Sequence, residues 1–331
     1  MSRAMSRVLL PLSALVAALF VASLLIGPAR IAPLDSLWGL FAPGPDPVSL
    51  VMREIRLPRA LLAVMIGASL GLAGAALQGY LRNPLAEPGL IGVSASAALG
   101  AVIAIQTGIA ASFALGLPLM ALAGALAAVV LVMGLAGPRG GSLVLILAGI
   151  AISAMAGALT QLALNLSQNP FAVNEIVFWM MGSLADRSMT HVWLALPFMV
   201  LGWLLLAPLG RGLDALTLGE DAAASMGVNL GRLRLALIVG TACVVGAGTA
   251  VAGAIGFVGL VVPHILRPLV GAQPSRLLPA SALGGAAMVL AADIAVRLVL
   301  PDRDLKLGVL TALVGAPLFL HLIYKTRRAL G

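Results

Sequence analysis

Residue types that catalyse reactions or bind metals are scarce in this sequence and lie far apart. The three histidines, His191, His264 and His321, do not show the spacing of metal ligands. Neither lysine follows a glycine, so no Gly-x-x-x-x-Gly-Lys-[Ser/Thr] loop is present to bind nucleotide phosphates. We also find no Ser/His, Asp/Asp or His/Glu pair suited to an intramembrane enzyme. We therefore expect this chain to hold no catalytic residue, metal site or cofactor of its own.

The segment Leu218–Val228 has charges arranged for a short helix outside an apolar run. Glu220 and Asp221 suit the positive end of a helix dipole, alanines follow them, and Gly227 is a natural stop. Asn229 could cap a second short helix. Acids near the start and a weak apolar face disfavour a helix lying on lipid. The pattern predicts a socket for another protein, made by Leu218, Gly219, Glu220, Asp221, Ala222, Ala223, Met226 and Gly227.

Arginines at three-residue spacing form a second concentration of charge. Arg53, Arg56 and Arg59 lead into an apolar run, and they lie near one face if the stretch is helical. Arg297 ends another apolar run, and Asp293 one turn earlier could pair with it. These arginines either snorkel to a bilayer interface or form a basic patch that docks an acidic soluble partner. We favour the docking patch, made by Arg56, Arg59 and Arg297.

The elements that position these groups follow from composition. Hydrophobic residues make up 61% of the 331 residues and charged residues 10%, against about 25% charged in an ordinary soluble domain. The chain has too little polar material to cover a soluble core, which indicates an all-α polytopic membrane protein. The net charge of +8 does not indicate nucleic acid, because the basic residues stand singly between apolar runs.

A spanning helix needs about 20 mostly apolar residues. The first run is longer than the core of a signal peptide, so we expect a retained span there. The break across Ala252–Ile255 is the least defined, since a hydropathy window could merge its two neighbours. We expect ten spans: Val8–Gly27, Leu57–Leu81, Gly89–Gln106, Phe113–Ala136, Leu143–Leu166, His191–Ala207, Leu233–Ala252, Ile255–Val270, Leu277–Leu300 and Leu305–Tyr324.

The distribution of lysine and arginine sets the expected orientation. With the N-terminus in the cytoplasm, the cytoplasmic segments hold twelve of these residues and the outer segments eight. Both termini are then cytoplasmic, as is the long loop 208–234. We expect residues 1–331 to form a single transmembrane domain. Glycine- and alanine-rich stretches suggest an inverted repeat of 57–166 and 233–324, a common design in transporters.

Seven segments along nearly the whole chain form an ordered set of motifs: Arg56–Arg59, Gln78–Gly92 with its Arg-Asn-Pro-Leu-Ala core, Trp179–Leu184, Leu218–Val228, Gly256–Arg267, Ala291–Arg297 and Gly308–Pro317. Each motif alone is weak, but their order is specific. Together they resemble the permease subunits of ABC importers for ferric siderophores, haem and cobalamin, the FecCD-type family.

The resemblance implies a type II ABC importer permease fold in a bacterial inner membrane. It implies a homodimer with the substrate pathway at its interface, two copies of a separate P-loop ATPase on the Leu218–Val228 helices, and an extracytoplasmic substrate-binding protein on the arginines. ATP hydrolysis would belong to the partner, and this chain would not be an enzyme. Cytoplasmic gates would be lined by Asn83, Pro84 and Leu85 and by the Gly140–Ser142 loop, with Gly141 and Ser142.

The resemblance leaves the cargo open, and a ferric chelate is our first expectation only because of the breadth of the family. A wide, weakly polar pathway for a bulky chelate has five candidate lining residues: Ser69, Gln78, Thr160, Gln161 and Asn165. Each could instead form a hydrogen bond between helices, which we favour.

The alternative function is an ion-coupled secondary transporter with inverted repeats. Such a carrier keeps a buried carboxylate for its ion or proton, but the interiors of these spans are nearly free of charged residues. A membrane scaffold or intramembrane enzyme is a third class, for which we find no convincing residues. Energy is therefore expected to come from another subunit.

Overall fold

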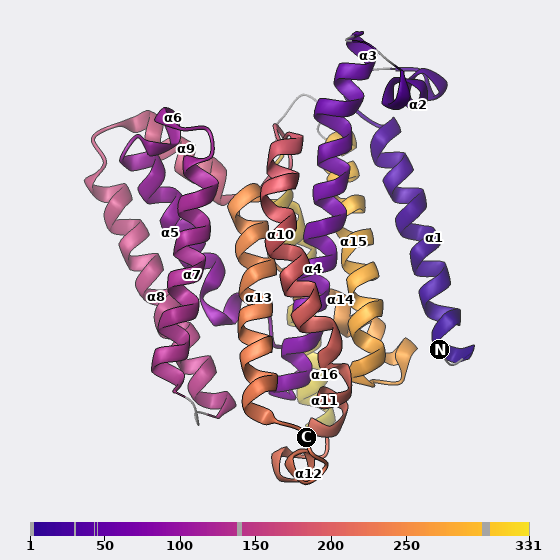
Figure 1. Ribbon diagram of the computed structural model, residues 1–331, viewed down its shortest axis with the longest axis vertical. Coiled ribbons are helices and arrows are strands. Elements are labelled where there is room, and N and C mark those ends of the chain that lie inside the picture. Colours follow the sequence, from indigo (N-terminus) through magenta and orange to yellow (C-terminus); the bar gives the residue numbers. More distant parts are fainter. Residues whose placement is uncertain are drawn as a thin grey trace.

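The computed structural model describes residues 3–29, 31–42, 44, 46–137, 141–299 and 305–330, and every regular element within them is helical (Figure 1). This confirms the all-α expectation. The principal helices are α1 (Arg3–Leu25), α4 (Leu57–Leu81), α5 (Val93–Gln106), α7 (Gly116–Ala136), α8 (Ser142–Leu166), α10 (Met189–Leu206), α13 (Leu230–Ala252), α14 (Val258–Leu266), α15 (Pro274–Val299) and α16 (Leu307–Leu330).

Shorter elements connect these helices. They are α2 (Pro33–Phe41), α3 (Pro47–Leu50), a π-helical turn η1 (Val51–Arg56), η2 (Pro88–Ile91), α6 (Ile109–Ser112), α9 (Pro170–Met180), η3 (Ala207–Leu209), α11 (Gly210–Leu216), α12 (Glu220–Ser225) and η4 (Arg267–Val270). Helices α2 and α3 fall in a stretch where the sequence predicted no element. Asp46 caps α3 by accepting the Ser49 N–H at 3.1 Å.

The ten predicted spans each correspond to one principal helix. Seven helices in the described residues are long and apolar enough to cross a membrane, and three shorter apolar helices, Val93–Gln106, Val258–Val270 and Leu307–His321, account for the others. The uncertain break is real: α13 ends at Ala252 and α14 begins at Val258. About ten membrane helices is therefore the right number, although the inverted repeat stays a prediction.

Helix α4 forms the centre of the bundle. In the span Pro47–Leu81 that contains it, 83% of the most apolar stretch is buried, against 11% in α1. Small residues explain how closely α4 approaches α15: a Cβ added at Gly67 would lie 2.3 Å from the Gly285 carbonyl oxygen, and one at Gly71 would lie 1.9 Å from that of Ser281. Such contacts let helices associate where lipid removes the hydrophobic drive.

The remaining helices surround this α4–α15 pair. Figure 1 shows α5, α7, α8 and α9 grouped on one side, α10 and α13 beside the centre, and α1 on the opposite flank. Helix α2 lies at one end of the molecule and α12 at the other; we call these the α2 end and the α12 end. The start of α1 and the last turns of α16 both lie toward the α12 end (Figure 1). An even number of crossings accounts for this arrangement.

Candidate functional sites

The face formed by α11 and α12 projects at the α12 end, outside the principal helices (Figure 1). As predicted, Glu220 and Asp221 occupy the first turn of α12. Gly227 follows the helix with φ +86°, and the Val228 N–H bonds back to the Ala223 carbonyl at 3.0 Å. This left-handed position favours glycine and ends the helix sharply.

One local prediction for this loop is wrong. Asn229 does not cap a second short helix; its side chain accepts the Arg232 N–H at 2.9 Å and caps the 23-residue span α13. The second short helix is α11, which precedes α12. Its buried Leu213 and Leu216 fix it to the bundle. Two short helices are therefore present, although their order along the chain differs from the expectation.

Large apolar side chains are exposed on the α11–α12 face. Leu218 is 69% exposed and Met226 63%, while Ala223 is fully buried beneath them. Glu220, Asp221 and Gly227 are also exposed, and Gly219 and Ala222 are half-buried. The eight predicted socket residues are thus brought together on one protruding surface with apolar and acidic groups side by side.

Asp214 anchors this face to the bundle and was not predicted from the sequence. Its carboxylate accepts the Ser275 N–H at 2.8 Å and the Gln273 side-chain amide at 3.0 Å. Ser275 lies in the first turn of α15. These hydrogen bonds join α11 directly to the start of α15.

The predicted gate turn lies between α4 and η2. Arg82 takes a left-handed conformation with φ +48°, and the Asn83 side chain accepts the Leu85 N–H at 2.9 Å. Asn83 and Pro84 are exposed, and Leu85 is half-buried. The other predicted gate residues, Gly141 and Ser142, begin α8. Gly140 lies outside the described residues.

Beyond this turn the chain returns into the bundle. The Gln78 side chain donates to the Ala86 carbonyl at 3.3 Å and accepts from Arg267 at 2.7 Å. Glu87 accepts the Phe257 N–H at 2.7 Å, immediately before α14. Phe257 has φ +67°, so the carboxylate holds a strained break between α13 and α14. This contact between the gate turn and the start of α14 was not predicted from the sequence.

Three glycines from distant segments form a close backbone junction, which we call the glycine junction: Gly182, Gly253 and Gly308. A Cβ added at Gly253 would lie 2.2 Å from the Trp179 carbonyl oxygen, and one at Gly182 would lie 2.2 Å from that of Ala254. The Gly308 N–H donates to the Gly182 carbonyl at 3.2 Å. The junction joins the connection before α10, the α13–α14 break and the start of α16.

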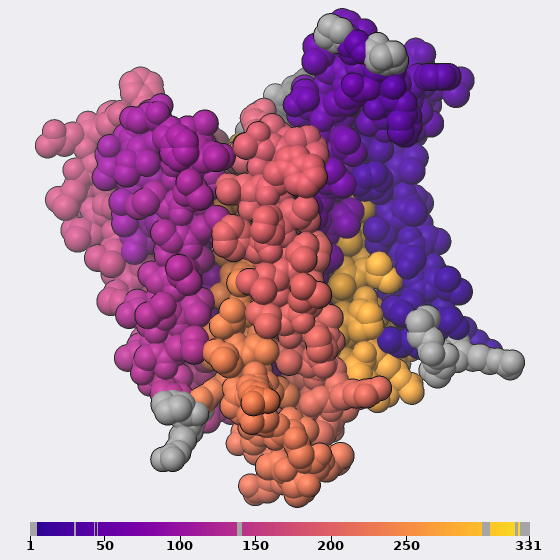
Figure 2. Space-filling view, in the orientation of Figure 1, coloured from indigo at the N-terminus to yellow at the C-terminus, as the bar shows by residue number. Residues whose placement is uncertain are grey.

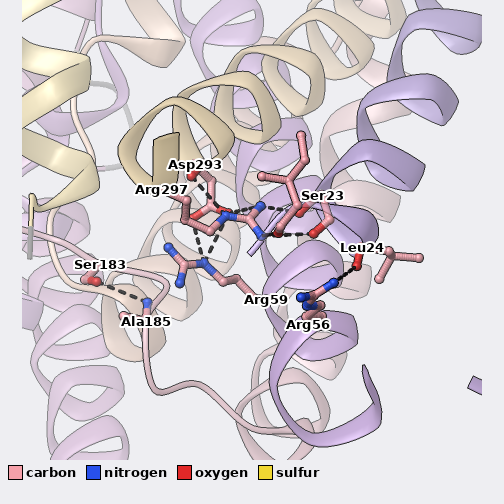
Figure 3. A network of polar contacts seen from close by, with 9 residues as sticks. Ser23, Leu24, Arg56, Arg59, Ser183, Ala185, Asp293 and Arg297 are labelled. Carbon is pink, nitrogen blue, oxygen red and sulfur yellow. Dashed lines mark hydrogen bonds and ion pairs between the residues drawn. The ribbon is translucent and has the colours of Figure 1, made fainter. Parts of the chain in front are cut away.

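The three predicted docking arginines gather near the α2 end, around the end of α1 (Figure 3). Asp293 pairs with Arg297 at 2.9 Å, as its spacing predicted, and also with Arg59 at 2.9 Å. Arg297 further donates to the Ser23 hydroxyl at 2.7 Å and the Ser23 carbonyl at 2.9 Å. Arg56 donates to the Leu24 carbonyl at 2.8 Å.

These contacts cap the last turn of α1, whose carbonyls lack partners within the helix. Arg56 is 3% exposed, and the Arg297 side chain is 6% exposed. The Arg59 side chain is 16% exposed. Arg53, the neighbour in the same series, donates to the Leu40 carbonyl at 3.1 Å and so holds α2. Arg53, Arg56 and Arg59 thus contact three different partners and do not form the shared face expected from their spacing, because η1 has π-helical geometry.

The five predicted pathway residues are not brought together. Ser69 is buried and accepts the Trp203 indole N–H at 2.9 Å, which confirms a hydrogen bond between helices. Gln78 is buried in the network described above. On α8, Thr160 is buried, whereas Gln161 and Asn165 are exposed on the outer surface of the chain.

A family model described as the FecCD transport family matches residues 15–325. The chain belongs to the FecCD transport family. The vitamin B12 import system permease protein BtuC of Salmonella typhimurium is 40% identical over 324 residues, covering 97% of this chain and 96% of BtuC. The uncharacterized ABC transporter permease protein YvrB of Bacillus subtilis is 39% identical over 283 residues, covering 84% of this chain and 80% of YvrB.

The fold of this FecCD chain also matches solved transporters. An inward-facing metal-chelate type ABC transporter superposes with a TM-score of 0.85 at 36% identity, covering 96% of this chain and 99% of that chain. PsaBC from Streptococcus pneumoniae has a TM-score of 0.51 at 16% identity, covering 80% and 88%, which indicates a shared fold alone. The chain is accordingly a multi-pass membrane permease of the ABC transporter class.

Proposed function

We propose that this chain is the permease subunit of an ATP-driven importer that moves a bulky metal chelate across a bacterial inner membrane by alternating access. The observation that supports this most is the protruding α11–α12 face, with exposed Leu218 and Met226, on a chain whose sequence has no phosphate-binding loop. A transporter that needs energy and cannot bind ATP itself requires a separate ATPase subunit. The α11–α12 face offers a surface to which such a subunit can bind.

In this proposal two copies of the permease form the pathway between them and two P-loop ATPase subunits bind the α11–α12 faces. The α12 end is then cytoplasmic, with both termini on that side. A substrate-binding protein delivers the chelate to the α2 end. The exposed Gln161 and Asn165 on α8 are available to a second copy, which would place them at the pathway.

The structure offers a physical route for the coupling. Closure of the ATPase dimer displaces α12 and α11, and the Asp214–Ser275 bond passes this displacement to α15. Helix α15 is packed without space against α4 through Gly67, Gly71 and Gly285, so the two helices move together. At the other end of α15, Arg297 pairs with Asp293 and donates to Ser23 in the last turn of α1. Motion at one end is thereby transmitted to the other.

We propose cobalamin and ferric chelates as the two cargo classes to test first. BtuC, a vitamin B12 import permease, matches over nearly its whole length, and the superposed transporter is of the metal-chelate type. Both cargoes are large and carry their metal within an organic ligand. No side chain of the described residues needs to bind the metal itself.

An ion-coupled carrier has less support. The buried carboxylate of Asp293 lies in a span, but two arginines neutralise it at 2.9 Å each, which leaves it no vacancy for a transported cation. A carboxylate that must bind and release an ion needs access to it.

The ATPase contact can be tested with two substitutions on the exposed face. Leu218→Asp combined with Met226→Asp should abolish co-purification of the partner ATPase, because it places two charges in an apolar contact. Both side chains are exposed, so the permease itself should fold normally. Thr190→Asp, at an exposed site on the opposite end, is the control and should retain the ATPase. Retention of the ATPase by the double variant would refute the assignment.

A further inference from the structure

A groove of about 690 Å³ opens on the side of the bundle, between α1, α10 and α15, with α4 at its base. Figure 2 shows it as a hollow between α10 and α1, with α15 visible on its floor. Its volume lies within the roughly 300–1,000 Å³ of ordinary ligand clefts. No residue of the α11–α12 face, the gate turn or the arginines at the α2 end lines the groove itself.

The walls of this groove suit a hydrocarbon chain. Leu9, Leu72, Leu278 and Leu283 contribute aliphatic surface from three helices. The Trp203 indole is held by its N–H donating to the Ser69 hydroxyl at 2.9 Å, so its polar atom is satisfied and its ring also lines the groove. A polar ligand would lose its hydration in such a site without gaining hydrogen bonds.

The length of the groove matches one leaflet of a bilayer. Lining residues on α15 run from Ser275 to Leu283, which is a rise of about 12 Å along a helix. Half of a hydrocarbon core that is about 30 Å thick is close to this length. An acyl chain lying along α15 would therefore enter from the α12 end and finish near the middle of the bilayer.

Three arginines stand where the head group of such a lipid would lie. Arg7 is one turn before Leu10 on α1, and Arg276 follows Ser275 on α15. Arg211 is the second residue of α11, one turn after Ala207 in η3. Leu10, Ala207 and Ser275 all line the groove.

Within the described ranges, the guanidinium groups of these three arginines have no hydrogen-bond or ion-pair partner. Asp214 lies three residues after Arg211, and its carboxylate accepts from Ser275 and Gln273, two neutral groups that leave its negative charge in place. The residues next to the lining at the α12 end of the groove therefore carry three positive charges against the one negative charge of Asp214.

We propose that this groove binds an acyl chain of an anionic phospholipid, whose phosphate lies among Arg7, Arg211 and Arg276. Basic pockets between membrane helices recognise anionic head groups through such charges. A bound lipid fills the opening beside α1, which is otherwise packed chiefly on α15. Lipid binding can be measured on the permease without cargo or ATPase, so failure of this proposal is distinguishable from failure of the proposed transport function.

Trp203 provides a direct probe, because bromine on an acyl chain quenches the fluorescence of an indole that it touches. The chain has four tryptophans; replacing Trp38, Trp179 and Trp193 by Phe leaves Trp203 as the only emitter. The protein is placed in vesicles of phosphatidylglycerol and phosphatidylcholine. In one set only the phosphatidylglycerol is brominated, and in the other only the phosphatidylcholine is brominated, with the same fraction of brominated lipid in both. We expect brominated phosphatidylglycerol to quench the Trp203 fluorescence at least about two-fold more strongly than brominated phosphatidylcholine, since each arginine adds attraction for the anionic lipid.

Removal of the arginines tests the head-group site. In R7Q/R211Q/R276Q, the two brominated lipids should quench equally. The control R82Q/R232Q removes two exposed arginines elsewhere at the α12 end and should keep the preference. Equal quenching in the parent, or a preference that survives the triple variant, would overturn the proposal. If the tryptophan replacements prevent folding, native mass spectrometry of the otherwise unaltered chain should show retained phosphatidylglycerol that the triple variant lacks.

Discussion

The carboxylate of Glu87 accepts the backbone N–H of Phe257 at 2.7 Å, and this bond joins the connection after α4 to the start of α14. The two residues are 170 positions apart in the sequence. A carboxylate at this point satisfies a backbone donor that the α13–α14 break leaves open and suits the positive end of the α14 dipole. The break and the gate turn are consequently parts of one structure.

Glu87 should make stability depend on pH. Burial raises the pKa of Glu87 above its ordinary value, and the Phe257 N–H partly offsets this. The folded chain therefore holds this proton more tightly than the unfolded chain, so stability falls as pH rises through the raised pKa. Glu87→Gln keeps an acceptor and removes the charge. At pH values above the raised pKa of Glu87, the melting temperature of the Glu87→Gln variant in detergent should exceed that of the parent. At pH values below the ordinary pKa of a glutamate, the two melting temperatures should be equal. A difference that does not change with pH would contradict this.

The glycine junction should not tolerate a side chain. Gly253→Ala puts a Cβ against the Trp179 carbonyl at a residue with φ +73°. We expect a loss of at least about 1–3 kcal/mol, the range for a non-glycine residue held in a strained conformation. The matched control is Gly134→Ala on α7, where a Cβ meets open space; there we expect a gain of roughly 0.5–1 kcal/mol. Thermal unfolding of the two purified variants measures both, and equal effects would refute the packing argument.

Asp293 should be essential to the α2 end of the bundle. Its side chain is 1% exposed and pairs with two arginines, so Asp293→Ala leaves buried positive charges unbalanced and should cost about 3–5 kcal/mol. Asp35→Ala, an exposed acid on α2, should change stability by less than about 0.5 kcal/mol. Comparable melting temperatures for the two variants would show that the ion-pair cluster is unimportant.

Arg59 is the best candidate for contact with a binding protein, because the guanidinium groups of Arg56 and Arg297 already donate to carbonyls at the end of α1. Arg59→Gln should lower the association rate of the binding protein and flatten its dependence on salt, as loss of a steering charge does. Arg56→Gln should act mainly on thermal stability, by releasing the Leu24 carbonyl. Surface-based binding kinetics at two salt concentrations separate these outcomes. A salt dependence unchanged in Arg59→Gln would exclude Arg59 from docking.

Much of the helical framework could be predicted because hydropathy and helix-breaking residues are local signals. The break at Gly253, the acids that begin α12 and the Asp293–Arg297 pair one turn apart all belong to this class. Longer-range relationships left no such trace. The second partner of Asp293 is Arg59, 234 positions away, and the partner of Glu87 is a backbone N–H, which any residue except proline offers. Their spacing predicted that Arg53, Arg56 and Arg59 share one helix face. The π-helical turn at Val51–Arg56 changes their directions, so they contact different partners.

In the proposed function, this permease draws its energy from an ATPase bound at the α11–α12 face. The most direct measurement is uptake of labelled cobalamin and ferric siderophore into proteoliposomes containing the permease, its ATPase and its binding protein. We predict uptake of one cargo that requires ATP, persists when ion gradients are collapsed by ionophores, and disappears in the Leu218→Asp and Met226→Asp double variant. Uptake by the permease without the ATPase, driven by an ion gradient, would refute the proposed function.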